Sequence, residues 1–137
     1  MSKYGEPEIY SRFLRKDWIK ENNTKVHFKA FLPTENKTTH RFEVSCFETQ
    51  LLDIEQIKQI FRINNILPNN KPPIAHCSIP EKDFLSEKLS IDRNYEPERH
   101  VDLIGWEKYQ SKEDRNEISS LLAEISSDII NIYEDNA

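Results

Sequence analysis

Hydrophobic and polar residues alternate in several stretches of the chain, which is the pattern of half-buried strands. The clearest stretch covers 41–47, where Phe42, Val44 and Cys46 fall on one face and charged or hydroxyl side chains on the other. A similar alternation covers 25–32, and we expect these two segments to pair as an antiparallel hairpin. Further strands are predicted at 8–16, 74–79 and 99–104.

Apolar residues at helical spacing predict a helix over about 51–63 and a long one over about 112–133. A shorter helix is predicted at about 80–88, with Ser78 and Glu81 as its capping box. This order of elements predicts an α+β fold. We expect a two-layer sandwich, in which a mainly antiparallel sheet of four or five strands carries two helices on one face.

Composition narrows the range of functions. At 137 residues the chain fits a single domain over 1–137. It has only 2 glycines, so glycine-rich phosphate loops are absent and no nucleotide cofactor is expected. The net charge of −5 disfavours broad binding to a nucleic-acid backbone, which needs clustered Lys and Arg.

The chain begins without an apolar leader and contains no membrane-spanning stretch, so a cytoplasmic protein that binds no membrane is expected. Its two cysteines, Cys46 and Cys77, fall on the apolar faces of predicted strands. In a reducing compartment we expect both to be free thiols in the core, which disfavours a thiolate nucleophile.

Two predicted strands carry the residues with possible chemistry. His76 and Ser78 fall on the polar face of one strand, and His100 and Asp102 on that of the other. If the strands are neighbours, His76 and His100 would act as acid and base at a phosphate, with Asp102 orienting an imidazole. The segment His76-x-Ser78 is similar to the H-x-S/T motif of the two-histidine phosphoesterases, although Asp102 departs from that motif in the second strand.

Two further kinds of site are weaker in the sequence. A zinc site would need paired ligands at short spacing, which is missing among the His and Cys residues, so no metal is expected. Binding of a single-stranded nucleic acid would need basic residues beside exposed aromatics. The residues available for it are Lys25, Lys29, Arg41, Trp18, Phe31 and Phe47.

Several short motifs along the chain resemble a family of small uncharacterised bacterial proteins. These motifs are Glu6-Pro7-Glu8-Ile9-Tyr10-Ser11-Arg12-Phe13, Asn22-Asn23, Ala30-Phe31, Arg41-Phe42 and Arg99-His100-Val101-Asp102-Leu103-Ile104-Gly105-Trp106. The hallmark of the family is the late Arg-His strand that ends in Gly-Trp before a C-terminal helix. The family has no assigned activity, so the resemblance implies no catalytic residue.

Together these observations favour a small bacterial accessory protein that acts through protein–protein contacts in a multi-gene system, such as a defence or toxin–antitoxin operon. Its partner would be another protein of the same operon. The contact residues would be Arg41, Arg99, His100 and Trp106. The alternative is a small phosphoesterase or RNA-processing enzyme that uses the His76/His100 pair.

Overall fold

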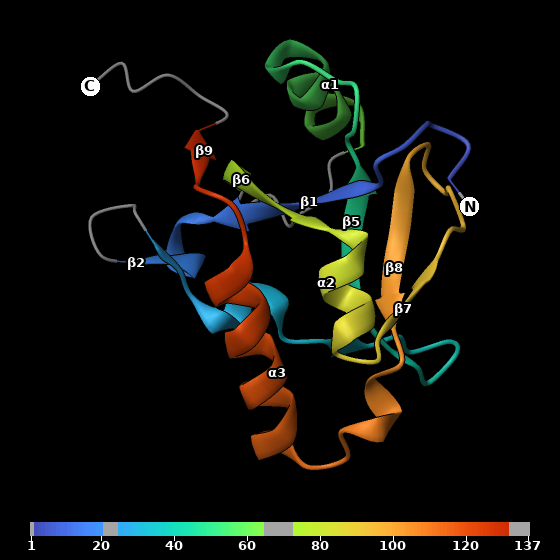
Figure 1. Cartoon of the computed structure of the whole chain (residues 1–137), viewed down its shortest axis with the longest axis vertical. Coiled ribbons are helices and arrows are strands. Elements are labelled where there is room, and N and C mark those ends of the chain that lie inside the picture. The colour runs from blue at the N-terminus through green and yellow to red at the C-terminus, as the bar shows by residue number, and fades with distance from the viewer. Residues whose placement is uncertain (1, 21–24, 65–72, 132–137) are drawn as a thin grey trace.

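The computed structural model describes residues 2–20, 25–64 and 73–131, and it confirms the α+β fold with a mainly antiparallel sheet (Figure 1). The strands of the main sheet are β1 (Ile9–Arg15), β4 (Thr34–Glu35), β5 (Phe42–Glu48), β6 (Pro73–Pro80), β7 (Ser90–Asp92), β8 (His100–Ile104) and β9 (Ile130–Asn131). Their order is β7-β8-β5-β1-β6-β9, and β4 pairs with β5. Two residues at each of β2 (Ile19–Lys20) and β3 (Lys25–Val26) form a separate pair.

Three helices and three short 3-10 turns complete the described chain. The helices are α1 (Ile54–Asn64), α2 (Glu81–Ser86) and α3 (Lys112–Ile125), and the 3-10 turns are η1 (Lys16–Trp18), η2 (Phe28–Phe31) and η3 (Trp106–Lys108). Among the described residues no helix has the length and apolarity needed to cross a bilayer.

The sheet consists of two halves joined at a short seam. β1 pairs with β6 along its whole length, but it pairs with β5 only at Tyr10–Glu48 and Ser11–Phe47. β5 pairs in turn with β8. In Figure 1, β1 and β6 lie across the view while β5 and β8 run down it. Beyond Ser11, β1 and β5 therefore separate, and the backbone groups that face this gap need other partners.

The main core lies on the face of the sheet that α2 and α3 cover. Strand residues with even and odd numbers alternate between faces, which places Leu14, Val44 and Leu103 on this face. They pack with Phe84 of α2 and Leu122 of α3, and all are almost fully buried. This burial of apolar area is the main stabilising contribution to the fold.

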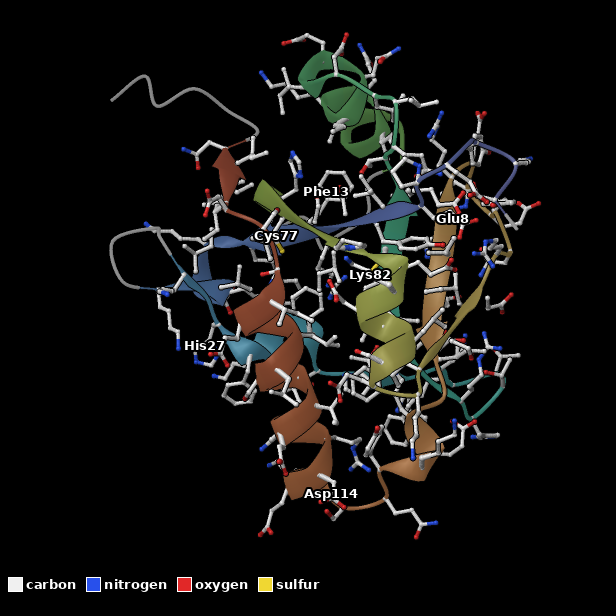
Figure 2. The ribbon with its side chains drawn as sticks, viewed as in Figure 1. Glu8, Phe13, His27, Cys77, Lys82 and Asp114 are labelled. Atoms are coloured by element: carbon white, nitrogen blue, oxygen red, sulfur yellow. The ribbon has the colours of Figure 1, made fainter. Side chains whose placement is uncertain are left out.

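A smaller cluster lies on the opposite face, against α1. It consists of Phe13, Phe47, Ile57 and Ile60, and Figure 2 shows Phe13 on the α1 side of β1. α2 and α3 thus lie on one face of the sheet and α1 packs against the other, so the expected two-layer arrangement with helices on one face is not confirmed.

The predicted strand over 25–32 is wrong beyond its first two residues. β3 ends at Val26, and η2 begins at Phe28 because His27 is its N-cap, with the His27 Nδ1 accepting a hydrogen bond from the Lys29 amide at 3.1 Å. The turn lets the adjacent residues Ala30 and Phe31 both be fully buried, which alternation in a strand would prevent. The predicted hairpin is therefore absent, and β3 pairs with β2 instead of β5.

Two predictions around Ser78 also need correction. The N-cap of α2 is Pro80, and the Ser78 hydroxyl instead contacts the Ser11 hydroxyl at 3.2 Å. The long helix ends at Ile125, because Ser127 pairs with Ser78 and leads into β9: the Ser127 amide donates to the Ser78 carbonyl oxygen, and the Ser78 amide donates to the Ser127 hydroxyl, both at 2.8 Å. Serine side chains compete with helical hydrogen bonds, which favours an end at this point. The last two residues of the predicted helix, 132 and 133, lie outside the described chain.

Candidate functional site

His76 and His100 point to the same face of the sheet, but the structure does not bring them together. β1 and β5 lie between their strands, so three strand spacings separate them by roughly 14 Å. Phe13 and Phe47 fill the interval, with ring centroids 6.3 Å from His76, 5.6 Å from each other and 5.3 Å from His100. The two imidazoles cannot hold one phosphate.

His76 lies in a dry environment. Its exposed fraction is 2 %, and neither ring nitrogen has a hydrogen-bond partner in the part of the chain that the structure describes. Burial lowers the pKa of His76 to about 4, so the imidazole is neutral at physiological pH. A base that is uncharged, covered and separated from His100 belongs to the packing of the small cluster.

The structure does bring together His100, Asp102 and Arg41, at the other end of this face. Arg41 donates to Asp92 at 2.9 Å and to Glu43 at 2.8 Å, and it lies 3.9 Å from Asp102. Three carboxylates thus surround the Arg41 guanidinium. Arg41 is committed to this network, which leaves little of its charge to offer to a partner protein.

A chain of hydrogen bonds fixes the orientation of His100. The Asp102 carboxylate can only accept, so the 2.7 Å contact with Asn94 is made by the amide nitrogen of Asn94. The amide oxygen of Asn94 then faces His100 Nδ1 at 2.8 Å, and Nδ1 must carry the proton. Nε2 is left as the acceptor, and the Ser45 hydroxyl donates to it at 2.7 Å.

Burial favours the neutral form of this imidazole. Burial lowers the pKa of His100, against the opposing charges of Asp102, Glu43 and Asp92. Burial likewise raises the pKa of Asp102, against the charge of His100. A neutral imidazole with a free electron pair on Nε2 is the form that can accept a proton from Ser45.

The other two predicted contact residues, Arg99 and Trp106, make contacts within the fold. Arg99 donates to the Glu48 carbonyl oxygen at 3.0 Å, and its guanidinium lies 4.1 Å from the centroid of the Tyr4 ring. Trp106 is fully buried, and its indole N–H donates to the Leu103 carbonyl oxygen at 3.1 Å. The chain turns into the core here because Gly105 adopts a left-handed conformation with φ of 98°.

Ser45 lines a groove of about 590 Å³ at the point where β1 and β5 separate. The sheet supplies its floor, and η1, η2 and β4 supply its walls. The lining residues are Arg12, Phe13, Arg15, Trp18, Lys29, Leu32, Thr34, Glu43, Ser45 and Phe47.

Arg12 is the unusual residue of the groove. It occupies a position between Tyr10 and Leu14 on the core face of β1, and its guanidinium fills the gap between the strands. It donates to the carbonyl oxygens of Ala30 at 2.7 Å and Ser45 at 2.8 Å. Burial lowers its pKa, yet among the described residues it has no carboxylate partner. Two of its five N–H donors are used, so three remain for another acceptor.

The groove is positively charged although the protein is acidic. Arg12, Arg15 and Lys29 face it, and Glu43 is the one carboxylate among the described residues that line it. Glu43 is already paired with Arg41, and Arg15 is paired with Asp17 at 2.9 Å. Although the whole chain carries a net charge of −5, this local excess of cations would attract an anion.

The sequence contains a signal for Arg12 but none for Ser45 or Asn94. Arg12 stands at an inward position of an otherwise apolar strand face, and a charge at such a position is rare without a functional or structural reason. The partnership of Ser45 with His100 depends on the register of β5 against β8, and that of Asn94 on the path of the loop after β7.

The other candidate chemistries lack support in the described chain. No group of three or more metal-type ligands is present there. Cys46 and Cys77 are buried, and burial raises the pKa of each thiol to about 12. The aromatics expected to stack on nucleic acid are covered: Phe31 and Phe47 are at most 1 % exposed, and two guanidinium groups lie over the Trp18 ring.

Comparisons with known proteins add no relative: no family model, no curated protein and no solved structure matches this chain. The resemblance to a bacterial family with a late Arg-His strand therefore stays a prediction.

Proposed function

We propose that this protein binds a phosphate-bearing small molecule in the groove between β1 and β5. The observation that carries the proposal is the Arg12 guanidinium, which is half-buried at the gap between the strands and has carbonyl partners but no carboxylate among the described residues. Buried charges in proteins are ordinarily paired, because an isolated one is costly. An anion in the groove would complete the pairing.

Phosphate fits this site better than a carboxylate. Its several oxygens can accept hydrogen bonds from more than one cation, and a guanidinium binds two of them in parallel. Lys29 and Arg15 line the same groove and could contact the remaining oxygens. A volume of about 590 Å³ lies within the range of small-molecule sites, so the ligand would carry an organic part that contacts Leu32.

The accessory role predicted from the sequence stays a second prediction. Its contact surface would have to be redrawn, since Trp106 is buried and Arg41 and Arg99 are held by internal partners. A protein partner could still approach the rim of the groove, where Lys29 is exposed.

Calorimetric titration with phenyl phosphate tests the proposal. We expect saturable binding that Arg12→Met weakens by at least tenfold, because a hydrogen bond to a charged group contributes about 1.5–3 kcal/mol. The matched control is Arg115→Met. Arg115 also donates to two backbone carbonyl oxygens, at 3.0 and 2.8 Å, and lies over an aromatic ring, but it is outside the groove. Absence of binding to the unmodified protein, or equal binding by both variants, would overturn the proposal.

A further inference from the structure

We infer that the groove is also a catalytic site, in which Ser45 is the nucleophile and His100 the general base for cleavage of a phosphodiester. This inference rests on the proposed function, because the cations of the groove must seat the phosphate beside Ser45. It assigns the chemistry to a different pair of residues from the two histidines that the sequence suggests.

The geometry is that of an activated serine. The Ser45 hydroxyl donates to His100 Nε2 at 2.7 Å, and Nδ1 of the same ring donates to Asn94 at 2.8 Å. A nucleophile, a base and a third group that orients the base form the arrangement that activates hydroxyls in unrelated enzymes. Asp102 holds the Asn94 amide in the required orientation, so Asn94 and Asp102 are positioning residues.

Ser45 is also placed where the anion would be. Its side chain lines the groove, and its own carbonyl oxygen accepts the 2.8 Å hydrogen bond from Arg12. His100 lies behind it, with 13 % of its side chain exposed. A phosphate held by Arg12 would therefore meet the hydroxyl from the open side, while the imidazole receives the proton from the covered side.

The reaction has two balanced steps. In the first, the Ser45 oxygen attacks phosphorus, its proton passes to His100 Nε2, and the bond from phosphorus to the leaving oxygen breaks; that oxygen takes the proton from Nε2. In the second, His100 takes a proton from water, the hydroxide attacks phosphorus, and the bond to Ser45 breaks with return of the proton. The cations of the groove stabilise the charge on the non-bridging oxygens in both steps.

Bis(4-nitrophenyl) phosphate is the probe for this activity. We expect release of 4-nitrophenolate and a 4-nitrophenylphosphoryl adduct that mass spectrometry maps to Ser45. Ser45→Ala should give neither, and His100→Gln should slow both by at least about 100-fold, the usual size of general-base catalysis. Ser90→Ala, an exposed serine on β7, is the control and should match the unmodified protein.

The pH profile and Asn94 separate catalysis from a structural role. Because burial lowers the pKa of His100 below 6.5, the rate should be flat at neutral pH and fall on acidification below that value. Asn94→Ala should lower kcat with little change in KM, since it loosens the base without touching the bound phosphate. Circular dichroism verifies that each variant is folded.

The outcomes distinguish this inference from the binding proposal. If phenyl phosphate binds in an Arg12-dependent way but the unmodified protein forms neither adduct nor nitrophenolate, the catalytic inference is overturned and the binding proposal stands. If neither binding nor turnover is seen, both are overturned. Turnover that persists in folded Ser45→Ala overturns the assignment of the nucleophile.

Discussion

Arg12 and Arg93 are both held between segments of the sheet, yet their surroundings are opposite. Arg93 donates to Glu8 at 2.9 Å and to Glu81, and its Nε lies 3.5 Å from Glu48. Arg12 has two carbonyl oxygens and, within the described chain, no carboxylate. A cation whose counter-charges come from the fold is a structural tie, whereas a cation without them leaves room for a ligand. Under our proposal, this difference separates an arginine that stabilises the fold from one that binds a ligand.

The Arg93 cluster ties three separate parts of the chain. Glu8 precedes β1, Glu48 ends β5 and Glu81 begins α2, and Figure 2 shows Glu8 at the end of β1 near β8. The Glu48 side chain is fully buried, and its carboxylate lies 3.5 Å from the Arg93 guanidinium and accepts hydrogen bonds from the hydroxyls of Tyr95 and Ser2, both at 2.8 Å. Removal of Arg93 would leave these carboxylates facing one another.

The largest predicted effect is on the stability of an Arg93→Met variant. We expect it to lose about 4 kcal/mol of unfolding free energy, because breaking a buried ion pair leaves uncompensated charge. Arg12→Met should lose only about 1 kcal/mol, since relief of the unpaired charge offsets part of the two lost hydrogen bonds. Urea denaturation at pH 7 measures both. Equal losses of unfolding free energy would mean that Arg12 stabilises the fold as much as Arg93 does, which would contradict the difference drawn between the two arginines.

Hydrophobic periodicity predicted the parts of the fold that alternate regularly, such as β5 with Val44 and Cys46 inward. It could not distinguish the strand expected over 25–32 from a 3-10 turn, because the choice depends on packing of Ala30 and Phe31 against α3. The Ser119 hydroxyl of α3 even donates to the Phe31 carbonyl oxygen, at 2.9 Å. Such contacts are made between segments far apart in the chain, and a local pattern contains no trace of them.

The candidate site, like the fold, was predictable from the sequence only as far as the alternation of strand residues determines it. Alternation correctly put His76 and His100 on the same face, but it says nothing about the order of strands, and β1 and β5 turned out to separate them. The sequence singled out His100 and Asp102, and the structure places them side by side, 3.6 Å apart. Their link through Asn94, and the contact with Ser45, follow from register and loop path, which only the structure provides.

The second prediction concerns His76, a buried base that avoids an unpaired charge by staying neutral, as Arg12 cannot. Its pKa is about 4 in the fold against an ordinary 6.5. Between these values the unfolded chain binds a proton that the folded one does not, so stability is full above pH 6.5 and falls as pH is lowered towards 4. The loss amounts to about 3 kcal/mol at 1.36 kcal/mol per pKa unit.

His76→Leu should lack this loss and be at least as stable as the unmodified protein at pH 7, because both ring nitrogens are without partners in the described chain. Urea denaturation of both proteins from pH 7 to pH 4 isolates His76, since every other titrating group is common to them. Parallel stability curves for the two proteins would show that the imidazole of His76 still binds a proton in the folded state. His76 would then be, like His100, a candidate for proton transfer.

The smallest predicted effect concerns two carboxyl groups of the Arg93 cluster, Glu8 and Glu81, whose pKa values are shifted in opposite directions. Burial would raise the pKa of Glu8, but hydrogen bonds with Glu81, the Ser2 amide and Arg93 outweigh it and lower the pKa. Burial and the hydrogen bond with Glu8 raise the pKa of Glu81. The contact between the two side chains thus favours the ionised form of Glu8 and disfavours that of Glu81.

The directions of these pKa shifts determine how each carboxyl group changes the stability of the fold with pH. Ionised Glu8 stabilises the fold above pH 4.5 and loses that contribution as pH falls through its lowered pKa. Glu81 contributes below pH 4.5 and loses its contribution as pH rises through its raised pKa. At pH 7, Glu8→Gln should therefore cost about 1 kcal/mol, while the isosteric Glu81→Gln should be neutral or stabilising by up to about 1 kcal/mol. Urea denaturation of both variants at pH 7 and pH 4 should show the two differences shrinking as acid protonates the unmodified carboxyls. If both substitutions destabilise equally, Glu8 and Glu81 stabilise the fold equally as ion-pair partners of Arg93, and the contrast of this cluster with Arg12 is larger than the raised pKa of Glu81 implies.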